Sequence, residues 1–386
     1  MATEVSLPVP ELRQAPATGT PEAVPEPKAE TAGRLASLDA FRGFTMFWII
    51  GGAAVVRSLA ILGKDPVTGF LAYQMEHTPW RGLRYYDLIW PSFMLMVGVS
   101  VAFSYASRSR VQSHGRMTGH AFARALILFL LGSLRTSVSS GSAAWIELSS
   151  ALQPIAVAYF IAFLLAGNSA RLQAAAAAVI LVGYGLLLHF VPAPGISPGS
   201  YQNNLNLVSW ADVAVLGRTH PEGWGTVLST IPTIATTLLG LLIGELLLSS
   251  RTLAYKMKII GLIGVSGIAL GLALDPVVPV VMKLWTVSYG IASAGWACLL
   301  FLFFLWIIDA RGYRGWSLAF VVIGMNAIAA YLAGTLVSFS RIVSPFTNLI
   351  APWLGVSGAL VRPLAVLTVE WLVLYWMYRR KIFIRV

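Results

Sequence analysis

The sequence predicts an all-α integral membrane protein, a polytopic bundle of about ten transmembrane helices. Hydrophobic residues make up 57% of the 386-residue chain, and its mean hydropathy is +0.75. Charged residues make up only 11%, less than half of the roughly 25% that soluble domains carry. Several uncharged runs reach the roughly 20 residues that an α-helix needs to cross a bilayer. Soluble, disordered and fibrous classes are therefore excluded.

The N-terminal segment differs in composition from the rest of the chain. Residues 1–33 hold six prolines and five acidic residues and no apolar run long enough to pack. This composition predicts a disordered tail, and the segment lacks the hydrophobic region of a signal peptide. The membrane domain is then expected to occupy residues 34–386.

Ten spans follow along the chain. We expect them at about 37–60, 86–107, 119–139, 148–168, 172–191, 225–248, 256–274, 285–308, 316–339 and 357–378. The longest connection, 191–225, is rich in Pro, Gly, Asn and Ser, and only this loop is large enough for a lid or a small binding surface. The stretch 341–357 is expected to be irregular, as a re-entrant or interfacial segment. Gly240 and Gly244, four residues apart, predict close helix packing.

The basic residues indicate the orientation of the chain. With the N-terminus inside, 18 of the 27 Lys and Arg residues fall on the inner side and nine on the outer side, as the positive-inside rule favours. Both termini are therefore expected in the cytoplasm, and the 61–85 and 191–225 loops outside; in a bacterium, the membrane would be the inner membrane. The net charge of +11 does not indicate a nucleic-acid partner, because the basic residues are spread over short loops.

A few ionisable residues lie within the expected spans, where they are costly and are candidates for function. Asp39 and Arg42, three residues apart, share a helical face and form either a structural ion pair or part of a phosphate-binding site. Arg124 reaches the inner surface or binds the same ligand. Glu245 and Glu370 are expected to reach an interface or to pair with a neighbouring helix.

The densest group of polar residues surrounds His77. A histidine at the mouth of a helix, with Asp87 ten residues later, supplies a base that titrates near neutrality and a carboxylate that can orient it. The alternative is a solvated loop histidine. The single cysteine, Cys298, excludes an intrachain disulfide and a cysteine metal cluster, and no metal is expected.

Seven motifs stand in a recognisable order. They are 38–43 (LDAFRG), 77–82 (HTPWRG) with 87–91 (DLIWP), 152–153 (LQ) with 158–159 (AY), 221–223 (PEG) with 225–226 (GT), 284–289 (LWTVSY), 324–326 (GMN) and 378–383 (YRRKIF). In these motifs the chain resembles the heparan-α-glucosaminide N-acetyltransferase family and its bacterial relatives, within the transmembrane acyltransferases. The chain departs from the family pattern at Arg81, Pro154 and His220.

The resemblance implies an enzyme that takes an acetyl group from cytoplasmic acetyl-CoA and delivers it to an amino sugar or glycan across the membrane. The catalytic histidine of the family matches His77, which Asp87 would orient. On the inner side, Arg42 and Arg124, with Asp39, are expected to bind the phosphates of CoA. Substrate contacts are expected at Trp80, Gln153, Glu222, Trp285, Ser288 and Asn326.

Two other functions remain open. A ten-helix bundle with polar residues inside also suits an amino-sugar transporter, which would use His77 for protons and would not need acetyl-CoA. A non-enzymatic scaffold fits the buried polar residues less well. The sequence leaves the acceptor, the acyl chain length and a homodimer undetermined.

Overall fold

The computed structural model describes residues 35–63, 65–146, 148 and 151–384, so the expected disordered tail lies outside the described residues. The α-helices are α1 (Ala36–Phe47), α2 (Ala53–Gly63), α3 (Pro66–Gln74), α4 (Ile89–Arg108), α5 (His114–Ser140), α6 (Leu152–Leu165), α7 (Ala170–Phe190), α8 (Leu207–Leu216), α9 (Thr230–Leu248), α10 (Leu253–Ala273), α11 (Val287–Phe304), α12 (Leu318–Met325), α13 (Ala327–Leu336), α14 (Phe339–Ile350) and α15 (Val361–Arg379). The π- and 3₁₀-helices are η1 (Trp48–Gly52), η2 (Tyr85–Leu88), η3 (Pro221–Gly223), η4 (Met282–Leu284), η5 (Leu305–Ala310), η6 (Gly315–Ser317) and η7 (Ala351–Leu360).

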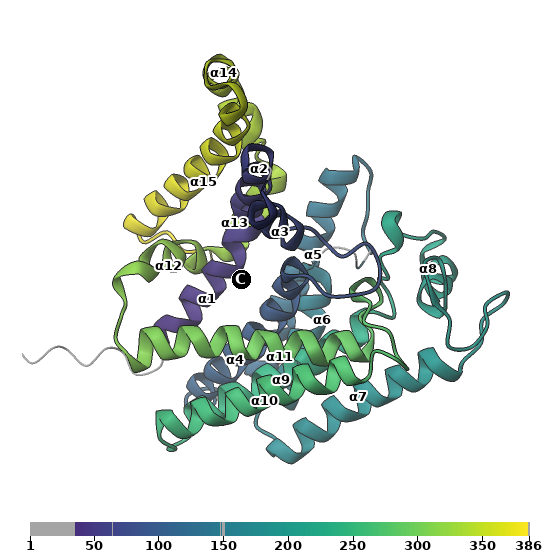
Figure 1. Cartoon of the computed structure of the whole chain (residues 1–386). Helices are drawn as coiled ribbons and strands as arrows, with labels where there is room; N and C mark the ends of the chain where they lie inside the picture. The colour runs from purple at the N-terminus through teal and green to yellow at the C-terminus, as the bar shows by residue number, and fades with distance from the viewer. Residues whose placement is uncertain (1–34, 64, 147, 149–150, 385–386) are drawn as a thin grey trace, which may run out of the picture. The chain divides into compact units, whose positions relative to one another are not determined.

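The all-α membrane architecture is confirmed. In the described part of the chain, eight helices are long and apolar enough to cross a membrane, and nine if the bent pair α12–α13 is one span. The strands there, β1 (Tyr201–Gln202) and β2 (Leu205–Asn206), form one short antiparallel pair. Figure 1 shows α10 and α11 running side by side, and α4 packs against α9 in the same bundle.

The expected span at 148–168 is shorter than predicted. Its helix, α6, has 14 residues and is about 21 Å long at 1.5 Å per residue, less than the roughly 30 Å hydrocarbon core. Gly167 adopts a left-handed conformation with φ 86° directly after the helix, a common way for helices to end. Apolar composition at 148–168 therefore overstated the helix length.

Two helical segments are interrupted within the bundle. The first expected span contains the π-helix η1, where Gly51 has φ 156° and ψ −19°, outside the helical region. A side chain at Gly51 would approach the Cβ of Leu367 in α15 to 3.2 Å. In the ninth span, α12 and α13 meet at an angle of 63°. Such breaks leave main-chain groups outside the regular hydrogen-bond ladder.

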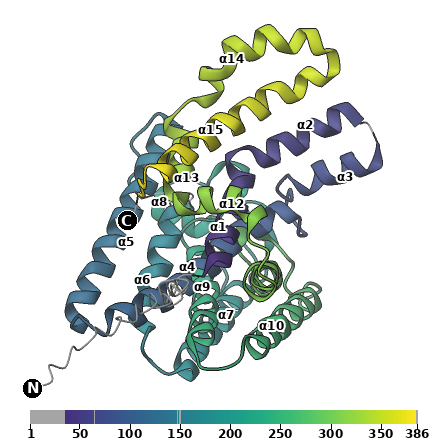
Figure 2. The ribbon, with the colours of Figure 1, turned by 90° about the vertical axis from the view of Figure 1, so that its left-hand side faces the viewer.

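The stretch 341–357 is mostly helical, so the expectation of irregular backbone was wrong; its placement as a re-entrant or interfacial segment stays a prediction. The strongly amphipathic helix α14 covers its first part and the 3₁₀-helix η7 its second. Figure 2 shows α14 lying beside α15, to which η7 connects it. The amphipathic periodicity of α14 outweighs Pro345, which lies inside the helix. Gly355, with φ 55°, interrupts η7.

Glycines set the closest helix contacts. A Cβ on Gly240 would overlap the carbonyl oxygen of Leu95 in α4, and one on Gly43 would overlap that of Phe320 in α12. Small residues let helix backbones approach in this way. The close packing expected at Gly240 and Gly244 is therefore confirmed. A glycine, Gly43, likewise lets α1 pack closely against α12.

Candidate functional site

His77 and Asp87 lie next to each other, as their spacing suggested. Nδ1 of His77 is 2.9 Å from Oδ1 of Asp87. Because an ionised carboxylate only accepts hydrogen bonds, this contact favours the tautomer of the neutral ring that carries its proton on Nδ1 and leaves Nε2 as the acceptor. The His77 side chain is 38% exposed and that of Asp87 is fully buried. The ring is therefore reachable from outside, while the residue that orients it is shielded from water.

Asp87 is fixed by the turn that it closes. Its Oδ2 accepts hydrogen bonds from Oγ1 of Thr78 at 2.6 Å and from the main-chain nitrogen of Arg84 at 2.9 Å. The hydroxyl of Tyr289 in α11 donates to the main-chain oxygen of Asp87 at 2.6 Å. Several donors stabilise a carboxylate in a buried position. The 77–87 turn is thus held to the start of α4 and to α11 at once.

Aromatic rings surround the His77 imidazole. Tyr86 packs edge-on against it at 4.8 Å between ring centres, and Trp224 does so at 5.2 Å. Trp224 in turn lies 6.4 Å from Trp90. These contacts limit the rotation of the imidazole, so the direction in which Nε2 points is set by packing as well as by Asp87.

A buried lysine supports this aromatic wall. Lys283 is only 8% exposed; its Nζ donates to the main-chain oxygen of Glu222 at 2.7 Å and lies 5.7 Å from the centre of the Trp224 ring. Oε2 of Glu222 accepts from Nε1 of Trp224 at 3.3 Å. Glu222 has φ 65°, a costly conformation for a residue with a side chain. The carboxylate predicted to contact substrate therefore acts, in this structure, on the tryptophan beside His77.

Trp285 and Ser288 lie behind the same wall. The Trp285 ring packs edge-on against Trp90 and Tyr289, and Tyr289 bonds to Asp87. Trp285 is 1% exposed and has φ 47°. Oγ of Ser288 donates to the main-chain oxygen of Pro279 at 3.0 Å. Both residues thus shape the protein behind His77 and are not open to its surface.

A cavity of about 710 Å³ lies beside Trp80, within the size range of small-ligand sites. Trp80 donates from Nε1 to the main-chain oxygen of Tyr201 at 2.8 Å, which fixes its ring against the 195–205 loop. The Gly223 position is packed against the Trp80 ring and against Asn203. His77 is not among the residues that line the cavity, but Trp80 follows it by three residues and Gly223 directly precedes Trp224, which packs on the imidazole.

Arg81 forms one wall of this cavity and ties two loops together. Its Nη2 is 2.8 Å from Oδ2 of Asp275, and the Gly82 nitrogen donates to the Val280 oxygen at 2.8 Å. The hydrogen bond from Arg81 lowers the pKa of Asp275, and a further bond from the Val280 nitrogen acts in the same direction. A residue that departs from the family pattern thus has a clear structural role here.

The basic residues expected to bind CoA lie farther along the helices. Nη2 of Arg42 donates to Oγ of Ser100 in α4 at 2.8 Å, and its Nη1 lies 3.5 Å from Asp39. Ser100 is eleven residues after Ile89, roughly 17 Å along α4. Arg124 places its guanidinium 4.9 Å from the centre of the Tyr159 ring in α6. These contacts connect Arg42 to α4 and Arg124 to α6.

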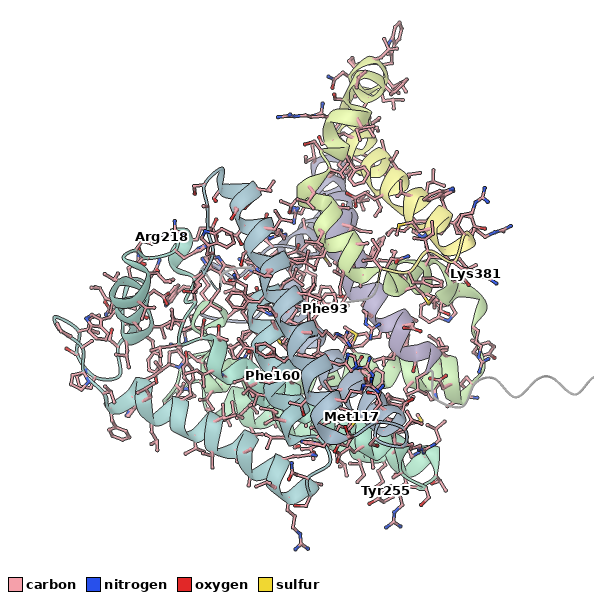
Figure 3. The ribbon with its side chains drawn as sticks, turned by 180° about the vertical axis from the view of Figure 1, so that it is seen from behind. Phe93, Met117, Phe160, Arg218, Tyr255 and Lys381 are labelled. Atoms are coloured by element: carbon pink, nitrogen blue, oxygen red, sulfur yellow. The ribbon has the colours of Figure 1, made fainter. Side chains whose placement is uncertain are left out.

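Gln153 and Asn326 contact other parts of the protein. Gln153 is fully buried; its Oε1 accepts from the Leu148 nitrogen at 2.6 Å, and its Nε2 donates to Ser133. Asn326, at the α12–α13 break, donates to the Ile382 oxygen and accepts from the Ile384 nitrogen, each at 3.0 Å. Lys381 lies just after α15 and beside α12 (Figure 3). Among described interactions, neither residue is linked to His77.

Sequence reasoning missed Thr78, Tyr86, Trp224 and Lys283. Thr78 directly follows His77, so its place in the turn was open to prediction. Lys283 carries a weaker signal: a lone basic residue before a long apolar run on the expected outer side. Its contact with Trp224 joins positions about 60 residues apart, which no local pattern reveals. Among the described residues, no group of three or more His, Cys, Asp and Glu side chains could hold a metal ion.

Fold and site together define a polytopic membrane protein with a histidine–carboxylate pair at one end of a transmembrane helix. No protein-family model matches the chain. Over 425 residues it is 23% identical to the heparan-alpha-glucosaminide N-acetyltransferase of Mus musculus, with 93% of this chain and 61% of that protein covered. The Homo sapiens enzyme of the same name is 25% identical over 369 residues, covering 78% and 52%. The chain spans about half to three fifths of these relatives, and the similarity supports a distant relation to them.

Proposed function

We propose that the protein is a membrane acetyltransferase that moves an acetyl group from acetyl-CoA to the amine or hydroxyl of an amino sugar or glycan. The observation that carries the proposal is the His77–Asp87 pair, with a free imidazole nitrogen, a buried carboxylate and an exposed ring edge. The distant similarity to two N-acetyltransferases supports the same chemistry.

In the proposed reaction, Nε2 of His77 takes a proton from the acceptor amine as the nitrogen attacks the thioester carbon. The C–N bond forms, the C–S bond breaks, and the imidazolium returns the proton to the departing CoA thiolate. Asp87 holds the required tautomer and stabilises the imidazolium. An acetyl-histidine intermediate is the alternative route; mixing labelled acetyl-CoA with protein in the absence of acceptor separates the two, because only this route labels His77.

Donor and acceptor are proposed to approach from opposite sides. Arg42 and Arg124, with Asp39 orienting Arg42, would bind the phosphates of CoA from the cytoplasm, since guanidinium groups suit phosphate geometry. The long pantetheine arm would carry the thioester along α4 toward His77. The cavity beside Trp80 would hold the sugar, with the indole face against a pyranose ring. A bacterial inner membrane is the proposed location.

A transporter of amino sugars is the second candidate. The α12–α13 break favours it, because discontinuous helices often form the substrate sites of carriers. Acetyl-CoA dependence discriminates between the two functions. A carrier would move amino sugar into vesicles without acetyl-CoA, whereas the enzyme would release acetylated product only when the donor is present.

The deciding experiment compares His77→Ala with the parent, using labelled acetyl-CoA and a panel of glucosamine-containing acceptors. Loss of the base should slow transfer by roughly 10²–10⁴-fold and leave acetyl-CoA affinity unchanged, because His77 lies apart from Arg42. The matched control is His114→Ala, which removes an exposed histidine and should keep the parent rate. A folded His77→Ala protein that acetylates at the parent rate would refute the assignment.

A further inference from the structure

Glu370 lies in the middle of a membrane-spanning helix. It is the tenth of the nineteen residues of α15, it is 6% exposed, and its Oε2 has no hydrogen-bond partner. An ionised side chain at this depth is expensive unless it is paired. The sequence had suggested that Glu370 pairs with a neighbouring helix or reaches an interface, and the structure shows neither.

Glu245 provides an internal comparison. It is the other acidic residue singled out within the expected spans, and its Oε1 accepts a hydrogen bond from Nε2 of Gln173 in α7 at 2.7 Å. Its position near the end of α9 also brings it close to the helix terminus. Glu245 therefore has the pairing that was expected of both residues, and Glu370 is the exception that requires a different explanation.

The surroundings of Glu370 are broken helix and apolar side chains. Leu367 and Leu374 lie three residues before and four residues after Glu370, on the same helical face. Leu367 packs against Gly51 in η1. Leu374 belongs to a cluster with Ile323 and Ala327 at the α12–α13 break. Glu370 thus lies on a helix that packs against η1, where Gly51 leaves the helical conformation.

In the described part of the chain, no cation pairs with the carboxyl group. The elements packed on α15 are α2, α12, α14, η1 and η7, and α1 and α13 join the same cluster. Their titratable groups and those of α15 itself are Asp39, Arg42, Arg57, Tyr331, Arg341, Arg362, Tyr375, Tyr378 and Arg379. Arg42 donates to Oγ of Ser100. Arg57 donates to the Met75 oxygen and Arg362 to Oδ1 of Asn348. Within the described residues, none of these groups bonds to Glu370.

We propose that Glu370 is a proton-binding site inside the membrane: a neutral carboxylic acid that exchanges its proton with water. The neutral form removes the cost of a buried charge, and the carboxyl group packs beside the kink at Gly51 in η1 and the bend between α12 and α13. This site is separate from the His77–Asp87 pair and does not depend on acetyl transfer, so a failure of either proposal leaves the other intact.

The first test uses dicyclohexylcarbodiimide on the full-length protein in lipid vesicles. A carboxylic acid in an apolar site adds across a C=N bond of the reagent, and the product rearranges to a stable N-acylurea that retains the whole reagent. Peptide mass spectrometry should find this adduct at Glu370 and lose it in Glu370→Gln. Glu245→Gln should keep the adduct, and labelling at Glu245 in the parent instead of Glu370 would contradict the proposal.

The second test does not need a reagent to enter the site. Infrared difference spectra between the parent and Glu370→Gln should show the carbonyl stretch of a protonated carboxylic acid, moved to lower frequency in D₂O. Absence of this band would overturn the proposal, and a band that does not move in D₂O would mean a locked proton and no exchange. The buffer cation is then changed from choline to sodium at constant ionic strength. Loss of the band in sodium would show that Na⁺ displaces the proton, and Glu370 would be reassigned as a sodium site.

Discussion

Asp87 orients the His77 ring, because one buried carboxylate receives the imidazole, the Thr78 hydroxyl and main-chain nitrogens at once. The carboxylate fixes both the conformation of the turn and the position of the ring proton. An amide in its place would still accept hydrogen bonds through its oxygen. Its NH₂ group, however, would face Nδ1 and favour the opposite tautomer.

The variant Asp87→Asn should therefore lose acetyl transfer by about 10²–10⁴-fold while it keeps acetyl-CoA binding. Thr78→Val is the matched control, since it removes one hydrogen bond to the same carboxylate and leaves the contact with His77. We expect a smaller loss of turnover for Thr78→Val, at a stability cost of about 1–3 kcal/mol. Single-turnover rates measure acetyl transfer in the two variants, and titration with acetyl-CoA measures donor affinity. Equal transfer rates for Asp87→Asn and the parent would rule out the orienting role.

The Arg81–Asp275 pair should make stability depend on acidity. Because the pKa of Asp275 is lowered in the fold, its contribution is complete above the unfolded value of about 3.9 and is lost as the pH falls through the lower folded value. Melting temperatures measured from pH 6 to pH 3 should fall more steeply for the parent than for Asp275→Asn. The difference should shrink in high salt, since both side chains are partly exposed. Parallel curves would show that the pair contributes nothing.

At the scale of elements, the sequence predicted most of the helices because long apolar runs are a strong signal. The spans at 86–107, 225–248 and 285–308 match α4, α9 and α11, apart from shifts at their ends. Prediction failed where the limits are set by contacts that leave no periodic pattern. Gln153 ties the start of α6 to Ser133 in α5, and the bend at Asn326 is bonded to the 382–384 segment, 56 and 58 residues away.

The site divides in the same way. The pairing of His77 with Asp87 follows from ten residues of local sequence, and the resemblance strengthened it. The wall made by Trp224 and Lys283 needs α9 and α11 to bring two distant loops together, so residue types alone did not reveal it. Predicted substrate contacts at Gln153 and Asn326 remain untested, although both amides are bonded to the main chain.

The α1–α12 contact should be sensitive to a single methyl group. Gly43→Ala would push its Cβ into the main chain of Phe320, so the helices must separate, and overpacking of this kind costs about 1–3 kcal/mol. Gly119→Ala in α5, where a Cβ meets nothing within 4 Å, should instead stabilise by about 0.5–1 kcal/mol. Melting temperatures in detergent compare the two variants. A Gly43→Ala protein as stable as the parent would show that the contact is loose.

For the whole molecule, the distribution of basic residues predicts which side of the membrane each loop faces. The single cysteine, Cys298, is fully buried in the core, so Cys298→Ser gives a background for labelling. In intact cells, a membrane-impermeant maleimide should label Ser197→Cys in the 191–225 loop and should reach Arg116→Cys only after lysis, as the distribution of basic residues predicts. Both positions are exposed. Labelling of Arg116→Cys in intact cells would reverse the orientation and the proposed direction of transfer.

The bond between Asn326 and the 382–384 segment also decides where an affinity tag belongs. The main chain of Ile382 and Ile384 satisfies both ends of a fully buried amide at the bend between α12 and α13. A truncation after Lys381 would remove those partners and leave the amide unsatisfied at a cost of about 1–3 kcal/mol. A bulky fusion joined directly after Val386 would crowd the same segment. A purification handle placed before residue 35, or joined through a long linker after Val386, would leave this bend undisturbed.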